Sequence, residues 1–116
     1  NCSANALEDA IGLLKAIGGD VSQIGDVPGM IMMRTICMLA NEAADAVYLR
    51  VCNEDDCDTA MRSGVNYPRG PLEWADKLGC SIIVDVLDHL ASFYGIDRYR
   101  VSPLLRRKAI LSQRFF

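Results

Sequence analysis

A long apolar segment between residues 29 and 51 places the strongest constraint on what this chain can fold into. Its polar residues Arg34, Asn41 and Asp45 are seven and four positions apart, so on a helix they form one narrow stripe. A helix that is apolar over most of its circumference is buried among other helices. We therefore predict a long helix at the centre of an all-α bundle. We expect Pro28 at its start, where the missing N–H of proline costs nothing.

Shorter helical segments flank this central helix. A first helix from Ala6 to Ile17 ends at two glycines, and residues 21–26 follow as an extended connector or a lone strand. Capping residues, prolines at first positions and terminating glycines then mark four more helices, at Asn53–Gly64, Pro71–Gly79, about 80 to Gly95, and Ser102–Leu111. The fold class is therefore all-α, with about six helices around a long buried central helix.

Helical spacing also predicts which side chains of these four helices face the core. They are Cys57, Ala60, Met61, Ile82, Ile83, Val86, Leu87, Leu90, Phe93, Tyr94, Leu104, Leu105, Ile110 and Leu111.

The composition bounds the class of protein. With 116 residues the chain fits one domain, and its apolar fraction of 51% indicates that some apolar surface is shared with a partner. No apolar run approaches the roughly 18 residues of a membrane span, and the N-terminus has no signal-peptide pattern. Because the chain does not begin with Met, we expect a fragment of a longer protein.

The charges are unevenly distributed. All 15 acids and six of the twelve bases lie in residues 1–97, whereas residues 98–116 carry six bases and no acid. A basic tail of this kind either binds nucleic acid or docks on acidic groups of its own fold or of a partner. The net charge of −3 and the absence of a nucleic-acid motif favour docking.

The five cysteines and the single histidine do not form a metal-binding pattern. No C-x-x-C pair is present, and His89 lies in a separate helical segment. We expect free, partly buried thiols and a cytoplasmic location. A P-loop, a G-x-G-x-x-G turn and a recognisable Ser/His/Asp arrangement are also absent from the sequence.

Five short motifs, taken in order, resemble the C-terminal helical domain of 3-hydroxyacyl-CoA dehydrogenases. The family pattern is a P-G-F-[IV]-x-N-R turn before a long helix, then N-E-A, D-x-A-M-[KR]-x-G, Y-P-x-G-P and a closing D-x-R-Y-[RK]…P-x-L-L-R. The corresponding segments here are 28–34, 41–43, 54–64 with an acidic cap before the motif, 67–71, 97–100 and 102–107, so the match covers roughly residues 27–111. Each motif alone is weak, but five in register are specific. The expected fold is similar to the C-terminal domains of 3-hydroxyacyl-CoA and 6-phosphogluconate dehydrogenases.

The resemblance implies NAD-dependent oxidation of a 3-hydroxyacyl-CoA to a 3-ketoacyl-CoA. In the family a separate Rossmann domain binds NAD and supplies a His–Glu pair as general base, and this chain has neither its fingerprint nor that pair. The helical domain contributes an Asn in the first turn of its long helix, a wall of the acyl-CoA cleft and a dimer interface. Met33 occupies the Asn position, and a thioether cannot replace the hydrogen bonds of an amide. We therefore expect no catalytic residue and no metal ligand in this chain.

Five residues match positions that the family places near substrate: Arg34, Tyr67, Pro68, Gly70 and Pro71. For Arg34 the alternative is a structural ion pair with Asp45, Glu42 or an acid across the bundle. For residues 67–71 the alternative is a rigid turn between helices, which needs both prolines and the glycine. Trp74 is expected to be a core or interface anchor, and His89 a core or edge residue.

Some family members carry two tandem helical domains, the second of which is often degenerate. We interpret residues 27–116 as such a second copy, from an enzyme of the bacterial 3-hydroxybutyryl- or 3-hydroxyadipyl-CoA dehydrogenase type. Residues 1–26 are then a linker helix and a short extended segment from a preceding region. The expected partners are the Rossmann domain, the first helical copy and a second subunit, with acyl-CoA as substrate of the whole enzyme and no contact with nucleic acid or membrane.

Three functions remain open from the sequence. The first is a non-catalytic assembly domain of the dehydrogenase, inactive alone. The second is a half-site that takes part in catalysis together with an NAD-binding domain. The third is a stand-alone helical module that binds acyl-CoA or proteins without dehydrogenase activity.

Overall fold

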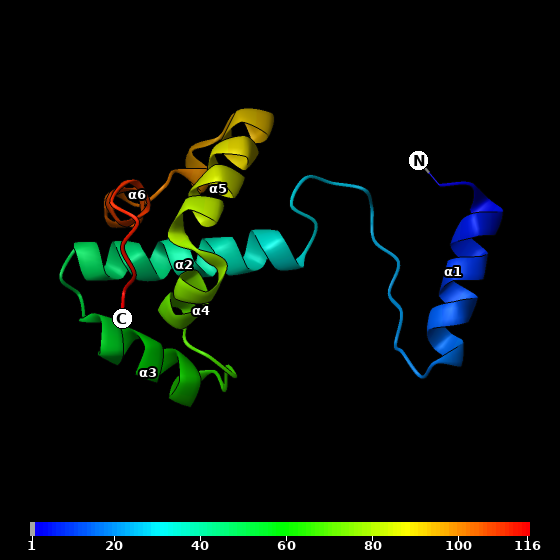
Figure 1. The fold of residues 1–116 in the computed structure, drawn as a ribbon, viewed down its shortest axis with the longest axis horizontal. Helices are drawn as coiled ribbons and strands as arrows, with labels where there is room; N and C mark the ends of the chain where they lie inside the picture. The colour runs from blue at the N-terminus through cyan, green and yellow to red at the C-terminus, as the bar shows by residue number, and fades with distance from the viewer. Residues whose placement is uncertain (1) are drawn as a thin grey trace.

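The computed structural model describes residues 2–116, and all of its regular structure in that range is helical (Figure 1). The elements are α1 (Ala4–Ala16), α2 (Met32–Tyr48), α3 (Glu54–Gly64), α4 (Pro71–Leu78), α5 (Cys80–Tyr94), the short 3-10 helix η1 (Asp97–Tyr99) and α6 (Pro103–Ile110). The predicted all-α class with about six helices is confirmed.

Helix α2 lies at the centre of the bundle, with α3, α4, α5 and α6 packed around it (Figure 1). Its buried residues Cys37, Ala40, Ala43 and Ala44 are small, which lets the neighbouring helices approach closely. Larger side chains from those neighbours complete the core, namely Leu72, Ile83, Leu87, Leu90 and Leu105. A long central helix is thus confirmed, and small α2 side chains interleave with large ones from its neighbours.

The ends of α2 differ from the prediction. The helix covers Met32–Tyr48 rather than 29–51. Gly29 and Met30 have φ angles of 76° and 42°, in the left-handed region, so the chain turns there before helical geometry begins. Pro28 therefore belongs to this turn and does not occupy the first helical position. At the other end, Arg50 with a φ of 59° turns the chain away.

Most of the predicted caps are confirmed. The Asn53 side chain accepts a hydrogen bond from the Asp56 amide at 2.8 Å, Pro71 opens α4, and Gly95 takes the left-handed conformation after α5. Gly64 is the last residue of α3, however, and the left-handed residue beyond it is Asn66. Ser102 stands at the N-terminus of α6, but its side chain makes no capping hydrogen bond.

Some predicted core residues are exposed instead: Ala60, Ile82, Phe93, Ile110 and Leu111. In α5 the buried face runs through Cys80, Ile83, Val84, Leu87 and Leu90, so Ile82 and Phe93 lie to the side of the contact with α2. Helix α6 buries only its first turn, at Leu104 and Leu105, and Ile110 and the following Leu111 are left exposed. Periodicity identified apolar faces, but not how much of each face a neighbour covers.

The basic C-terminal segment docks on acids of the same fold, as its charge pattern predicted. Arg100 pairs with Asp45 on α2 at 2.7 Å, and Arg106 pairs with Asp88 on α5 at 2.6 Å. The hydrogen bond from Arg106 lowers the pKa of Asp88. Beyond α6, the Asp76 carboxylate accepts hydrogen bonds from the amides of Phe115 and Phe116.

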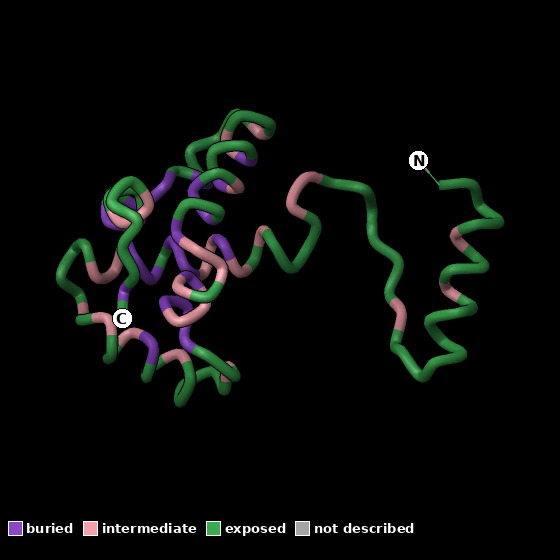
Figure 2. The backbone as a smooth tube through the Cα atoms, viewed as in Figure 1, coloured by how far each residue is buried: buried purple, intermediate pink, exposed green. Residues whose placement is uncertain are grey.

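Helix α1 stands apart from the bundle (Figure 1) and buries none of its residues. Its apolar side chains include Leu13, Leu14 and Ile17, which are 67%, 47% and 74% exposed. The connector that follows is extended and forms no strand in the described part of the chain. Figure 2 shows that the buried residues lie in the bundle, whereas the N-terminal arm is almost entirely exposed. No helix among residues 2–116 is long and apolar enough to cross a membrane.

Candidate functional site

An apolar groove of about 1350 Å³ lies between the extended connector and the start of α2. Its lining residues are Asp20, Ser22, Ile24, Asp26, Val27, Pro28, Gly29, Met30, Ile31, Met32, Met33, Ile36, Leu78 and Phe93. Several of these large apolar side chains are widely exposed, among them Met32 at 67% and Phe93 at 66%. Exposed apolar side chains gathered in one place are typical of an interaction surface.

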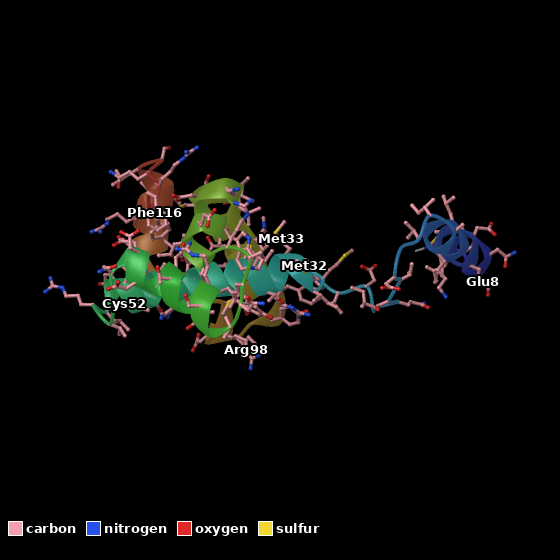
Figure 3. All side chains as sticks on the ribbon, turned by 90° about the horizontal axis from the view of Figure 1, so that it is seen from below. Glu8, Met32, Met33, Cys52, Arg98 and Phe116 are labelled. Atoms are coloured by element: carbon pink, nitrogen blue, oxygen red, sulfur yellow. The ribbon has the colours of Figure 1, made fainter. Side chains whose placement is uncertain are left out.

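Met33 lies in the first turn of α2 and lines this groove (Figure 3). Its sulfur accepts a hydrogen bond from the Cys37 thiol, one helical turn further on, at 3.7 Å. Burial raises the pKa of Cys37 to about 11, so this thiol keeps its proton at neutral pH. The groove therefore presents a thioether that is already paired with a buried thiol, and a thioether offers no hydrogen-bond donor.

Arg34 points away from this groove and toward aromatic residues of the C-terminal half. Its guanidinium donates to the Tyr94 hydroxyl at 3.3 Å. The hydroxyl of Tyr99, and then that of Tyr94, raises the pKa of Arg34. The ion pair that was the alternative for Arg34 is not formed within the described residues. Asp45 pairs with Arg100 instead, and Glu42 makes no salt bridge with Arg34. Arg34 instead lines a separate hollow of about 400 Å³ together with Tyr99 and Arg98.

Residues 67–70 connect α3 to α4 and Pro71 begins α4, and none of these residues lines the groove that contains Met33. The Tyr67 ring packs against Trp74 with 5.6 Å between centroids, and Trp74 is half-buried. Pro68 is exposed, whereas Gly70 and Pro71 are buried. The structure therefore separates Met33, Arg34 and the 67–71 turn into three places. Contact between substrate and any of the five predicted residues stays a prediction.

Asp58 explains the geometry of this turn, and sequence reasoning missed it. The side chain is 1% exposed, and its two oxygens accept hydrogen bonds from the Leu72 and Glu73 amides at 2.9 and 2.8 Å. Asp58 of α3 thus caps the N-terminus of α4, where the helix dipole favours a negative charge. A β-carbon at Gly70 would overlap the Asp58 carboxylate, so glycine is required there. In the sequence, Asp58 stood only as the first residue of the D-x-A-M-[KR]-x-G motif, with no role assigned to it.

Asn41 is the second polar residue whose role the sequence did not reveal. It is 1% exposed and bridges to the segment before α6. Its amide nitrogen donates to the Arg100 carbonyl at 3.0 Å, and its oxygen accepts from the Ser102 amide at 2.7 Å. The asparagine of the N-E-A motif therefore satisfies backbone groups of a connection that has no regular structure.

The histidine and the five cysteines do not form a reactive or metal-binding cluster in the described part of the chain. His89 is exposed on α5, so it is neither a core residue nor part of the groove. All five cysteines are free, as predicted, with Cys37 and Cys80 buried. Residues 2–116 contain no group of three or more potential ligands that could hold a metal ion.

Comparison with known proteins agrees with this architecture. Residues 29–113 match the family model of the 3-hydroxyacyl-CoA dehydrogenase C-terminal domain. A curated 3-hydroxyadipyl-CoA dehydrogenase of Escherichia coli is 49% identical over 107 residues, which are 92% of this chain and 22% of that protein. The chain thus spans about a fifth of the length of this relative.

Two solved structures share the fold. A crystal structure of 3-hydroxybutyryl-CoA dehydrogenase from Escherichia coli has a TM-score of 0.81 and 47% identity, and covers 95% of this chain and 23% of its own. The structure of (S)-3-hydroxybutyryl-CoA dehydrogenase from Ralstonia eutropha has a TM-score of 0.88 at 25% identity, covering 95% of this chain and 39% of its own. The chain belongs to the family of 3-hydroxyacyl-CoA dehydrogenase C-terminal domains.

Proposed function

We propose that this chain is the assembly domain of an NAD-dependent 3-hydroxyacyl-CoA dehydrogenase and contributes no catalytic group of its own. The observation that carries the proposal is the apolar groove at the start of α2. Met33, at the position of the family Asn, lines this groove with a thioether bonded to Cys37. A surface with large exposed apolar side chains suits packing against protein, whereas hydrogen bonding to a reacting hydroxyl requires a donor or acceptor.

The partners we infer are a preceding Rossmann domain, a first helical copy and a second subunit. Helix α1 supports a preceding region, because its apolar residues Leu13, Leu14 and Ile17 have no cover within the described chain. We assign residues 1–26 to the link with that region and residues 27–116 to the second helical copy. A pseudo-dimer of tandem copies would reproduce the symmetric pairing of single-copy relatives.

We infer that the whole enzyme oxidises a 3-hydroxyacyl-CoA with NAD, as the names of the relatives and the family resemblance suggest. The described residues do not fit a dinucleotide site of their own. They form helices only, and the sequence lacks the G-x-G-x-x-G turn that follows a strand in such sites. We therefore assign NAD to the preceding domain. Free cysteines favour a reducing compartment, and we propose the cytoplasm.

Association of the 116-residue chain tests the assembly role. We expect sedimentation coefficients that rise with protein concentration, because the groove remains uncovered in a monomer. Met32→Glu places a charge on this surface and should shift the chain toward monomer. Ile110→Glu is the matched control, since Ile110 is 76% exposed on α6 and does not line the groove. A monomer at every concentration, or equal effects of the two variants, would refute the assembly role.

A further inference from the structure

A second hollow, of about 400 Å³, lies between α2 and η1. Among the described residues, none lines both this hollow and the groove at the start of α2. Met38 and Leu39 of α2 and Tyr99 of η1 supply its apolar lining. Arg34 and Arg98 supply positive charge, and Arg98 lies below α2 in the view of Figure 3. Small-molecule sites typically have a volume of roughly 300–1,000 Å³ and an apolar lining with a few placed polar groups.

Arg34 is held in position by aromatic residues rather than by an acid. Its guanidinium donates to the Tyr94 hydroxyl at 3.3 Å, and the Tyr94 ring packs against Tyr99 with 5.5 Å between centroids. A phenol hydroxyl accepts the hydrogen bond without neutralising the positive charge. An arginine side chain has five N–H donors, so most of them remain available beside this contact. Arg34 therefore lines the hollow as a fixed cation.

The positive charge of the hollow is not compensated within the described part of the chain. No salt bridge among residues 2–116 involves Arg34 or Arg98. Glu42 also lines the hollow, but it follows Arg34 by about two turns of α2 and pairs with neither arginine. Two cations and one acid leave a net positive charge beside an apolar surface.

We propose that this hollow is a binding site for a short aliphatic carboxylate. Guanidinium groups bind carboxylates through paired N–H···O hydrogen bonds, which places the charged end of such a ligand at Arg34 and Arg98. Its hydrocarbon chain would then cover Met38, Leu39 and the Tyr99 ring and remove apolar surface from water. A phosphate ion has no apolar part, so it would leave this lining in contact with water. The proposal does not depend on the function proposed above.

Titration of the full native polypeptide with hexanoate tests the proposal, with the line width of the hexanoate methyl signal in NMR as the readout. We expect binding with a Kd of roughly 1–10 mM, as for other small ligands at partly open sites. Hexanamide has the chain without the charge, and acetate has the charge without the chain. Each should bind at least about threefold more weakly than hexanoate.

Three variants locate the bound hexanoate. Arg98→Gln should weaken binding by about threefold, and it should fold normally because Arg98 is exposed. Glu42→Gln should strengthen binding by about twofold, since it removes a negative charge near the carboxylate. Arg107→Gln is the matched control, because Arg107 is exposed on α6 and does not line the hollow. It should leave the Kd unchanged.

Three results would overturn the proposal. The first is no binding of hexanoate at millimolar concentrations, and the second is equal binding of hexanoate and hexanamide. The third is an equal Kd for Arg98→Gln, Glu42→Gln and Arg107→Gln, which would place any bound hexanoate elsewhere. If hexanoate is excluded and Arg98→Gln alone lowers the unfolding midpoint in urea, a carboxylate of the protein itself occupies the hollow instead of a free ligand.

Discussion

At the scale of single residues, the close contact between the Asp58 side chain and Gly70 determines how α3 joins α4. The Asp58 carboxylate occupies the space where a side chain at Gly70 would lie, and from there it holds the first two free amides of α4. The family motifs that contain these residues, at 58–64 and 67–71, are therefore joined by one buried contact. The glycine of the Y-P-x-G-P motif has a structural reason that involves no ligand.

We predict that Gly70→Ala destabilises the fold by roughly 3 kcal/mol, because the new β-carbon must displace the buried carboxylate and break its two hydrogen bonds. The measurement is the free energy of unfolding in urea. Gly64→Ala is the matched control, since a β-carbon there meets nothing within 4 Å, and it should be neutral or slightly stabilising. In an Asp58→Ala background, Gly70→Ala should cost less. Equal costs in both backgrounds would contradict the contact.

At the scale of elements, one side chain on the central helix fixes the segment before the last helix. Asn41 bonds to Arg100 and Ser102, and Arg100 pairs with Asp45 one helical turn away. Asn41 and Asp45 therefore face the chain between η1 and α6, where Asn41 satisfies backbone groups that no regular structure satisfies. The salt bridge between Arg100 and Asp45 is partly exposed, so the buried amide of Asn41 contributes more to stability.

We predict that Asn41→Ala lowers the free energy of unfolding by about 3 kcal/mol, since it leaves a buried amide and a carbonyl unpaired. Glu42→Ala, at an exposed position on the same helix, should change it by less than about 0.5 kcal/mol. Urea unfolding of both variants decides the matter. An Asn41→Ala protein as stable as Glu42→Ala would mean that the bridge contributes little.

Local signals made much of this fold predictable. The Asn53 cap, Pro71 at a first helical position and the left-handed Gly95 each act within a few residues, so the sequence alone could place these helix ends. The roles of Asp58 and Asn41 could not be predicted in this way. Their partners are 14 and about 60 residues away, and they meet only after the helices have packed.

The candidate site was only partly predictable for a related reason. Met33 was singled out through a motif, but the motif does not predict the groove that Met33 lines. Arg34 follows it directly in sequence but projects to Tyr94 on a different face of α2. One step along a helix turns the side chain through about 100°. Neighbours in a motif therefore need not share a site.

At the scale of the whole molecule, one part of the described chain has a buried core and the other part leaves apolar side chains exposed. The bundle buries α2 from the level of Cys37 onward, whereas α1, the connector and the first turn of α2 leave large apolar side chains exposed (Figure 2). The shape extends over 51 × 33 × 23 Å because α1 stands away from the bundle. We propose that the rest of the dehydrogenase covers these exposed apolar side chains. A surface that packs against protein needs no catalytic group, so we expect the assembly role and the non-catalytic role together.

Turnover of the full native polypeptide tests that account most directly, as NAD-dependent oxidation of a 3-hydroxyacyl-CoA followed by NADH absorbance. We predict measurable dehydrogenase activity, and a kcat for Met33→Ala within about twofold of wild type. Met32→Ala, a neighbouring groove residue, is the control for loss of apolar surface alone. A fall of roughly 10²–10³-fold in Met33→Ala but not in Met32→Ala would show that this domain takes part in the reaction. The absence of any oxidation would contradict the dehydrogenase assignment.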